Sequence, residues 1–453
     1  MIQWTDSLVR RILGLPAAAA TPASTPYGAI ATDTRHLTSG SLFVALKGEN
    51  FDGHDFLAQA AAAGATAAVV RVGTPEIPGL TLYQVPDTLR ALGELAHARR
   101  MTVSGPVVAI TGTNGKTSTK EMIAAALRTR YRTYATRSNL NNLVGVPLTI
   151  LEAPDDTEAM VLEAGANLPG EIARHREVIA PSIAVVTNAA AGHLEGFGSG
   201  EQVLREKLAL TDGVALAVVG TDPPALAELA RQRARKVLSA GLAGADRTPA
   251  RVELTPDGRP RVSIGQETFL LDARGKHQAG NAMLAWTVAE ALGLEAGKVA
   301  RSLEALLLPG GRGELQQYGD LTILNDAYNA NPASFRAAIE LARALRGKRR
   351  LVFVAGTMRE LGESSAAHHG EIAALLLGLR PDLLAAVGEF VPILEAHRAS
   401  LGDRLLTAPD AAVLAPLLAE RLQGDEFIVL KGSRGVALER LLPDLVARAS
   451  STT

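Results

Sequence analysis

The stretch Pro106–Arg130, PVVAITGTNGKTSTKEMIAAALRTR, decides the fold of this 453-residue chain. It opens with a short apolar run rich in β-branched residues, which predicts a buried strand. From Lys120 onward, apolar residues recur at helical spacing without a helix breaker, so a helix is expected. The loop between them joins a strand to a helix N-terminus, where free backbone N–H groups and the helix dipole favour an anion.

This loop, TGTNGKTS, departs from the usual phosphate-binding pattern of Gly, four residues and Gly-Lys-Thr/Ser, because Ile110 stands where the first Gly is expected. Gly112 and Gly115 still let the backbone wrap closely around phosphate oxygens. Lys116 would place its charge on the β- and γ-phosphates, and Thr117 would offer its hydroxyl to Mg²⁺. An ordinary strand-to-helix turn is the alternative interpretation.

The composition excludes several classes of protein. Hydrophobic residues make up 47% of the chain, charged residues 21%, and the formal net charge is −1, so neither a nucleic-acid partner nor membrane insertion is expected. No apolar run reaches transmembrane length, and the N-terminus does not resemble an export signal. The chain has no cysteine, which excludes disulfides and thiolate chemistry. We therefore expect a cytoplasmic protein, and a monomer.

The pattern of segments predicts three α/β domains. Residues 1–102 alternate short strands with an Ala-rich helix and form a small α/β domain. Residues 103–309 alternate strands and helices, which predicts a doubly wound, mostly parallel sheet around the phosphate loop; an antiparallel meander around the turn at 256–258 interrupts it. Residues 310–453 resume the alternation and predict a Rossmann-like α/β domain.

Polar residues follow several predicted strands, at the edge where open α/β sheets bind ligands. Glu163 ends an apolar strand and could bind Mg²⁺, or it could be a solvated side chain at the strand end. His193 follows the next strand and could be a metal ligand or an ordinary loop histidine. Lys207 lies on a predicted helix, where a solvated lysine is the simplest interpretation. Asn281 could read an adenine edge or cap a helix, and Arg312 could bind phosphate or lie on a surface loop.

The third domain has a polar edge of its own. The stretch NDAYNANP places polar side chains after a strand, with Pro332 opening a helix. Two further strand ends, VAGTMRELG and VLKGSRG, add Glu360 and a Lys-Gly-Ser-Arg run. The polar residues named by these patterns are Asp326, Tyr328, Asn329, Asn331, Lys431, Ser433 and Arg434.

Together these motifs resemble the Mur ligase family, the ATP-dependent amide-forming enzymes of peptidoglycan synthesis, over nearly the whole chain. The short phosphate loop is similar to that family's own. NLNNLVGVPLTIL (139–151), NDAYNANPASF (325–335) and TDTRHLTSGSLFVALKGENFDGHDF (32–56) most resemble the branch that adds D-alanyl-D-alanine to UDP-N-acetylmuramoyl-tripeptide. The third stretch resembles the family's uridine-nucleotide-binding N-terminal domain.

The resemblance implies roles for individual residues. ATP would contact Gly112, Thr113, Asn114, Gly115, Lys116, Thr117, Ser118, Asn281, Arg312, Asp326 and Tyr328. Magnesium would be held by Thr117, Glu163, His193 and Lys207, the last as a carbamate formed with CO₂. The substrates would contact Thr34, Arg35, Lys47, His54, Asn141, Asn142, Asn329, Asn331, Ser433 and Arg434. Catalysis would depend on Lys116, His193, Lys207 and Lys431.

The resemblance also implies a reaction in which ATP converts a carboxylate into an acyl phosphate that the dipeptide amine then attacks. Two other interpretations stay open. One is a related ligase that adds a diamino acid to the muramoyl dipeptide or glutamate to folate. The other is an NTPase-driven switch or binding module with no dependence on an amine acceptor.

Overall fold

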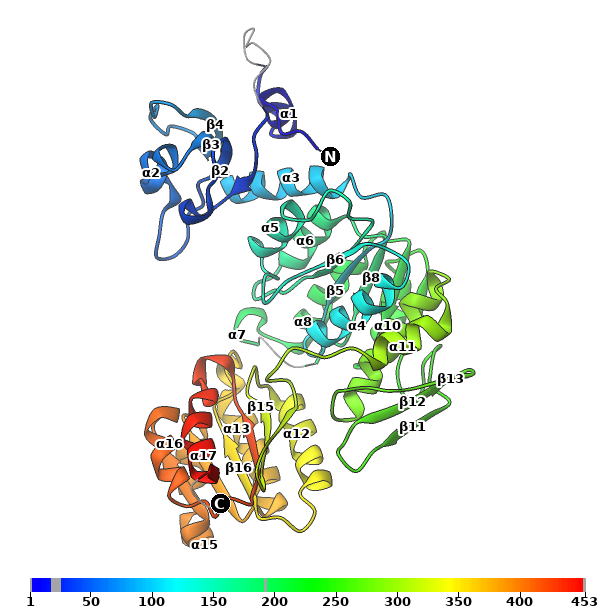
Figure 1. Ribbon diagram of the computed structural model, residues 1–453, viewed down its shortest axis with the longest axis vertical. Coiled ribbons are helices and arrows are strands. Elements are labelled where there is room, and N and C mark those ends of the chain that lie inside the picture. Colours follow the sequence, from blue (N-terminus) through cyan, green and yellow to red (C-terminus); the bar gives the residue numbers. More distant parts are fainter. Residues whose placement is uncertain (1, 18–25, 191–193, 451–453) are drawn as a thin grey trace. The chain divides into compact units, whose positions relative to one another are not determined.

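The computed structural model describes residues 2–17, 26–190 and 194–450 (Figure 1). They pack as two compact units. The first comprises Met1–Ile110, Arg130–Ala166 and Gly170–Ala184, and the second comprises Thr111–Thr129, Asn167–Pro169 and Val185–Thr453. No described helix is long and apolar enough to cross a membrane.

The N-terminal sheet has four parallel strands in the order β1-β2-β3-β4. Alternate residues of a strand point to opposite faces, and both faces are covered: Val44 packs towards α1 and α3, whereas Phe43 packs towards α2. The bounds are β1 Ile30–Ala31, β2 Ser41–Val44, β3 Ala65–Arg71, β4 Thr81–Val85, α1 Asp6–Ile12, α2 Leu57–Ala62 and α3 Thr88–Arg100.

The central sheet has six strands in the order β10-β9-β8-β5-β7-β6. Every residue of β5, β7 and β8 is buried, as expected for strands covered on both faces. The strand order reverses beside β5, and ligands of open α/β sheets bind where such a reversal occurs. The strands are β5 Val107–Thr111, β6 Thr133–Ala135, β7 Ala159–Glu163, β8 Ile183–Val186, β9 Leu216–Val219 and β10 Val237–Ser239.

The helices that accompany this sheet include α4, which begins directly after the phosphate loop. Their bounds are α4 Lys116–Arg128, α5 Gly145–Leu151, α6 Glu171–Ile179, α7 Leu194–Phe197, α8 Gly200–Leu208, α9 Leu226–Arg231, α10 Lys276–Ala291 and α11 Ala296–Glu304. The predicted meander is confirmed as three antiparallel strands, β11 Arg251–Leu254, β12 Pro260–Ile264 and β13 Glu267–Leu270.

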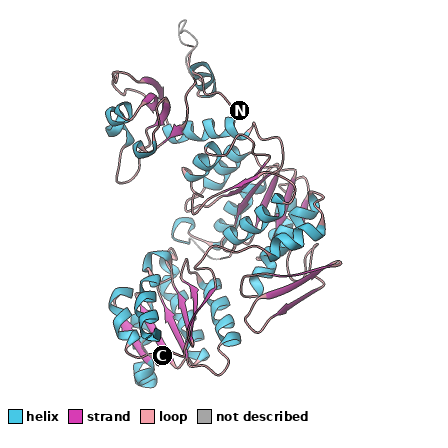
Figure 2. Cartoon of the chain, in the orientation of Figure 1, coloured by secondary structure: helices cyan, strands magenta, loops and turns pink. Residues whose placement is uncertain are grey.

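The third sheet has the order β14-β15-β19-β16-β17-β18, and only its edge strand β14 runs antiparallel. Helices cover both faces (Figures 1 and 2). The strands are β14 Glu314–Tyr318, β15 Leu321–Asp326, β16 Leu351–Ala355, β17 Leu383–Val387, β18 Leu405–Ala408 and β19 Phe427–Lys431. The helices are α12 Pro332–Leu345, α13 Ser365–Leu379, α14 Phe390–Glu395, α15 Arg398–Leu401, α16 Ala411–Ala419 and α17 Leu442–Ser450.

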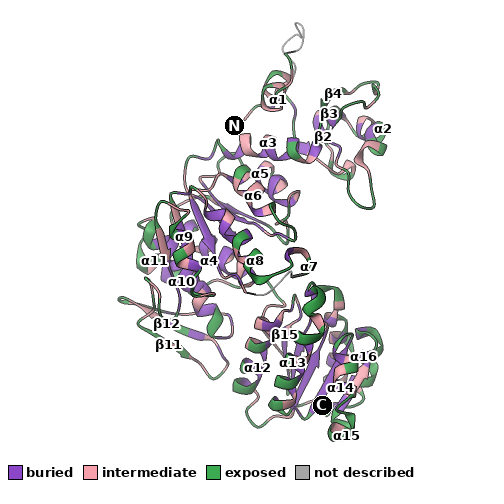
Figure 3. Ribbon diagram, turned by 180° about the vertical axis from the view of Figure 1, so that it is seen from behind, coloured by how far each residue is buried: buried purple, intermediate pink, exposed green. Residues whose placement is uncertain are grey.

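The sequence alternation of these strands builds two separate cores. Phe353 and its neighbours on one face pack with α12, α13 and α14, whereas Val352 and Val354 pack with α16 and α17. The central strands β16, β17 and β19 are accordingly buried throughout, whereas the edge strand β14 is partly exposed (Figure 3). The predicted α/β fold with largely parallel sheets is thus confirmed.

Phe353 provides a test of this core. It is fully buried and its ring stacks near Phe335, with centroids 6.4 Å apart. Phe353→Ala should lower the free energy of unfolding by about 3–5 kcal/mol, because it removes buried apolar surface and leaves a cavity. Leu375→Ala, on an exposed part of α13, is the matched control and should cost under about 1 kcal/mol. Equal urea midpoints for the two variants would contradict this packing.

Candidate active site

The phosphate loop is shaped by its two glycines. Gly112 has a φ of 143° and Gly115 a φ of 79°, values that L side chains rarely adopt. A Cβ at Gly112 would overlap the Thr187 hydroxyl, and a Cβ at Gly115 would lie 2.5 Å from Asn281 Oδ1. The loop backbone therefore approaches its neighbours more closely than any other residue type allows.

Lys116 is the first residue of α4, and its side chain folds back over the loop. Its ammonium donates to the carbonyl oxygens of Gly112 at 2.8 Å and Thr113 at 3.1 Å. Thr117 and Ser118, the next residues of the helix, are buried. The ammonium thus lies beside the first N–H groups of α4, and a helix N-terminus of this kind favours an anion.

Residues after β8 hold the loop in place. Thr187 Oγ1 donates to the Asn114 carbonyl at 2.6 Å, and Asn188 both accepts from Asn114 N–H and donates to its carbonyl, each at 3.0 Å. Thr113 Oγ1 donates to the carbonyl of Ala190 at 2.8 Å. Thr187 and Asn188 were not predicted as site residues, although the Thr-Asn pair directly after an apolar strand was a visible signal.

Glu163 ends β7, opposite Ile110 of β5 in the strand pairing. Its side chain is buried, and its Oε1 accepts from Asn141 Nδ2 at 2.9 Å. Asn142 Oδ1 accepts from the N–H groups of Val144 and Gly145, where α5 begins. The structure therefore places Asn141 against Glu163 and gives Asn142 a local role at a helix start.

Lys207 is not on a solvated helix face. It lies on α8, its side chain is 1% exposed, and its ammonium is 5.4 Å from the centroid of the Phe197 ring. The simplest sequence interpretation, a solvated lysine, is wrong because the apolar face of α8 carries Lys207 inward. His193, predicted beside it, lies outside the described residues.

Asn281 lies inside α10 and does not cap it, because the helix begins at Lys276 after Gly275. The capping alternative is therefore wrong. Its Nδ2 donates to Gln278 Oε1 at 3.0 Å, and its Oδ1 faces Gly115 of the phosphate loop. The structure thus brings Asn281 to the predicted nucleotide site.

In the third domain, Lys431 fixes the loop that follows β15. Its buried ammonium contacts Asp326 Oδ2 at 2.7 Å and donates to the carbonyls of Asp326 at 3.2 Å and Asn329 at 2.8 Å. Asn331 caps α12 through Ser334 N–H and begins a capping box, with Pro332 at the first helical turn as predicted. A charge that is buried with three oxygen partners holds its surroundings firmly.

Ser433 joins three strand ends. Its hydroxyl accepts from Arg359 N–H at 2.9 Å and donates to the Ala330 carbonyl at 3.4 Å, while its own N–H donates to the Thr357 carbonyl. The side chain is buried. Ser433 thus ties the loops after β15, β16 and β19 together.

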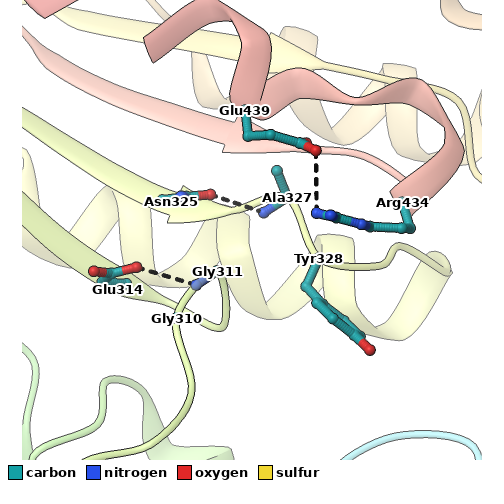
Figure 4. A pocket seen from close by; sticks show the side chains of 8 residues that line it. All are labelled: Gly310, Gly311, Glu314, Asn325, Ala327, Tyr328, Arg434 and Glu439. Carbon is teal, nitrogen blue, oxygen red and sulfur yellow. Dashed lines mark hydrogen bonds and ion pairs between the residues drawn. The ribbon is translucent and has the colours of Figure 1, made fainter. Parts of the chain in front are cut away.

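A pocket of about 250 Å³ opens beside this edge. Arg434 reaches into it and pairs with Glu439, N to O 3.1 Å, whereas the Tyr328 ring points away from that pair (Figure 4). The lining residues are Gly310, Gly311, Glu314, Asn325, Ala327, Tyr328, Arg434 and Glu439. The predicted residues Tyr328 and Arg434 therefore share one pocket.

The N-terminal residues lie on loops. Thr34 and Arg35 form a short 3₁₀ turn, and Arg35, which is exposed, lies 2.6 Å from Asp33 and holds the pKa of that carboxyl well below its usual range. The backbone of Lys47 pairs with that of Asp52 in an isolated antiparallel β-bridge. Both ring nitrogens of His54 are engaged, by Asp52 Oδ1 at 2.6 Å and by the Arg71 N–H at 3.0 Å.

Three family models match the chain: the Mur ligase family catalytic domain over residues 26–100, the Mur ligase middle domain over 110–289, and the Mur ligase glutamate ligase domain over 311–434. The chain belongs to the Mur ligase family of ATP-dependent ligases. It is 35% identical to the UDP-N-acetylmuramoyl-tripeptide–D-alanyl-D-alanine ligase of Bacillus subtilis, over 92% of this chain and 93% of that one.

Solved structures agree with this family. A MurF crystal structure from Acinetobacter baumannii matches with a TM-score of 0.89 and 31% identity, covering 99% of both chains. MurF ligase from Thermotoga maritima in complex with ADP matches with a TM-score of 0.83 and 28% identity, covering 94% of this chain and 98% of that one.

His369, which sequence reasoning missed, supports this edge from beneath. The ring is fully buried; its Nε2 accepts from Met358 N–H at 2.9 Å and its Nδ1 donates to the Ser365 carbonyl at 2.9 Å. This pattern requires the neutral ring. Burial lowers the His369 pKa below its usual value, against a smaller opposite effect of Glu389. The only sequence signal was the pair of histidines at 368–369.

The His369 pKa shift predicts a pH dependence. Because the folded-state pKa is lowered, the neutral ring stabilises the fold fully above the unfolded value of about 6.5, and this stability is lost as pH falls through the folded pKa. The melting temperature should therefore decline between about pH 7 and pH 5. His369→Gln should flatten that decline, whereas His368→Gln, on the adjacent partly exposed histidine, should leave it unchanged. An equal decline in wild type and His369→Gln would refute this assignment.

Proposed function

We infer that the chain is the ligase that joins D-alanyl-D-alanine to UDP-N-acetylmuramoyl-tripeptide, with ATP converted to ADP and phosphate, in peptidoglycan precursor synthesis. The observation that carries this is the near full-length similarity to the Bacillus subtilis ligase of that name. The phosphate loop supplies the supporting chemistry, because Lys116 and the α4 N-terminus form the anion site that such a reaction needs.

The reaction proceeds in two steps. A carboxylate is a poor acyl donor, so the γ-phosphoryl group of ATP is first transferred to the carboxylate at the peptide end, giving an acyl phosphate and ADP. The amine of the dipeptide then attacks the acyl carbon, loses a proton, and displaces phosphate through a tetrahedral intermediate. Positioning and charge stabilisation dominate the first step, and a dry site with fixed geometry favours the second.

We assign the nucleotide to the phosphate loop. In the described chain, Lys116 donates to two loop carbonyls; on binding ATP it would exchange these acceptors for phosphate oxygens. Asn281 would contact the adenine base. Arg312 and Asp326 would contact the remaining polar groups of the nucleotide. Thr113 and Asn114 are held by side chains and backbone after β8, so the loop is organised before the nucleotide arrives.

Magnesium would be held by oxygen ligands. The Thr117 hydroxyl, the buried Glu163 carboxylate and a carbamate on Lys207 are hard donors of the kind that Mg²⁺ prefers, and His193 would complete the set. A carbamate would add a second anionic oxygen ligand beside the Glu163 carboxylate. When bound, the ion offsets charge on the phosphate oxygens.

The uridine nucleotide of the other substrate would be bound by Thr34, Arg35, Lys47 and His54. Its peptide would be contacted by Asn141 and Asn142. The acceptor would be met by Asn329, Asn331, Ser433 and Arg434, with the Arg434 guanidinium binding the dipeptide carboxylate. Lys431 acts on these contacts indirectly, because its ammonium already has three oxygen partners. We further propose that the enzyme works as a cytoplasmic monomer.

The acceptor assignment can be tested by competition. With ATP and a UDP-muramoyl-tripeptide, D-alanyl-D-alanine should yield amide, whereas meso-diaminopimelate, L-lysine and L-glutamate should not; product mass and ADP release measure this. Lys116→Ala should slow amide formation about a hundredfold or more, because it removes a charge that stabilises phosphoryl transfer. Amide formed with diaminopimelate or glutamate but not with the dipeptide would overturn the acceptor and leave the ligase chemistry standing.

The carbamate on Lys207 makes a separate prediction. With ¹³C-labelled bicarbonate, the wild type should show a carbamate resonance that Lys207→Ala lacks, and Lys207→Ala should lose activity by about a hundredfold or more. A small carboxylate such as acetate should restore part of it. Lys236→Ala, on an exposed lysine, is the control and should be indistinguishable from wild type. An unmodified Lys207 in a nucleotide-bound structure, with Lys207→Ala fully active, would contradict the carbamate.

A further inference from the structure

Arg312 is carried by a tight loop between α11 and β14. Gly311 and Gly313, on either side of it, have φ values of 73° and 71°, which only glycine adopts readily. Gly311 N–H donates to Glu314 Oε2 at 3.1 Å. The loop therefore turns sharply and presents the single long side chain of Arg312 from a fixed backbone.

The loop rests on Tyr328. Tyr328 N–H donates to the Gly311 carbonyl at 3.2 Å, and a Cβ built on Gly311 would lie 3.5 Å from Tyr328 Cβ. Tyr328 is itself held from both sides, because Lys431 binds Asp326 and Asn329 in the same loop. The ring thus offers a firm platform.

Arg312 stacks on that platform. Its guanidinium carbon is 3.9 Å from the Tyr328 ring centroid, against 4.9–5.3 Å for the arginines above Tyr83, Tyr131, Tyr134 and Phe427. Its Nε is buried and, within the described part of the chain, has no hydrogen-bond partner. A guanidinium attracted to a ring face gains from cation–π and stacking interactions, so the ring takes the place of a polar partner.

We propose that Tyr328 is a positioning residue for Arg312: its ring face fixes the guanidinium plane so that the terminal N–H groups meet oxygens of the nucleotide. This rests on the proposed nucleotide role of Arg312. It also changes the role expected for Tyr328, which acts on ATP through Arg312, with its own ring covered on one face by the guanidinium. The hydroxyl takes no part.

A double-mutant cycle tests this. ADP affinity is measured by calorimetry for wild type, Tyr328→Leu, Arg312→Gln and the double variant, with Tyr328→Phe as the conservative variant. Tyr131→Leu, which removes a different ring below an arginine, Arg130, is the matched control. KM for ATP, KM for the dipeptide, kcat and melting temperature are measured for each, since a merely structural role would lower the melting temperature without a selective change in nucleotide affinity.

Tyr328→Leu should weaken ADP binding about five- to thirtyfold, the range of a partly desolvated cation–π contact. The double variant should bind about as weakly as Arg312→Gln alone, because coupled residues are not additive. Tyr328→Phe and Tyr131→Leu should stay within about twofold of wild type, and KM for the dipeptide should not change.

Three results would overturn the proposal: wild-type ADP affinity in Tyr328→Leu, losses that multiply in the double variant, or a Tyr328→Phe defect equal to that of Leu. If Arg312→Gln leaves ADP affinity unchanged, both the nucleotide role of Arg312 and this inference fall. Failure of the proposed function would look different. In that case the wild type would form no amide with the dipeptide, but the ADP affinities of the double-mutant cycle could still be measured and compared.

Discussion

The polar edge of the third sheet depends on one buried charge, the ammonium of Lys431. The last residues of β15 and β19, Asp326 and Lys431, are paired in register, so the side chain is delivered directly beneath the loop that follows β15. A buried ammonium is costly unless oxygens surround it, and here a carboxylate and two carbonyls do so. The requirement to satisfy Lys431 therefore sets the path of the backbone from Asp326 to Asn329.

The path of this backbone segment positions the residues that follow it and the neighbouring strand ends. Tyr328 lies between the two residues that Lys431 binds, Asp326 and Asn329. The carbonyl of Ala330, the next residue after Asn329, accepts from the Ser433 hydroxyl. Ser433 in turn binds Arg359, and Thr357 of the same loop binds Glu389 N–H. Side chains thus link the ends of β15, β16, β17 and β19 to one another. A site built in this way can place several polar groups with little cost in ordering when a substrate binds.

The sequence was sufficient for the fold class, because strands and helices depend on local signals. Apolar runs of five residues predicted the strands, and the Gly-Lys-Thr after β5 predicted the anion site. It was not sufficient for what those residues contact. Asn141 donates to Glu163 across 22 positions, and Lys431 reaches back 105 positions to Asp326; such pairs depend on sheet order, which no local pattern encodes.

Lys207 and His54 show which features of a side chain's surroundings the sequence pattern leaves open. Lys207 resembles a surface lysine in sequence, but the helix phase turns it inward, where its side chain is 1% exposed and its ammonium lies 5.4 Å from the centroid of the Phe197 ring. The His54 ring has Asp52 Oδ1 and the Arg71 N–H as its partners, and the sequence pattern around it does not encode the second of these contacts.

In the phosphate loop, a lysine ammonium is again surrounded by oxygen acceptors of the chain itself. Lys116 donates to carbonyls of its own loop, so nucleotide binding as proposed above would exchange one set of acceptors for another. The exchange favours phosphate because an anionic oxygen binds an ammonium more strongly than a carbonyl does. Under that proposal, Lys116 would contribute to nucleotide affinity only the difference in strength between those two bonds.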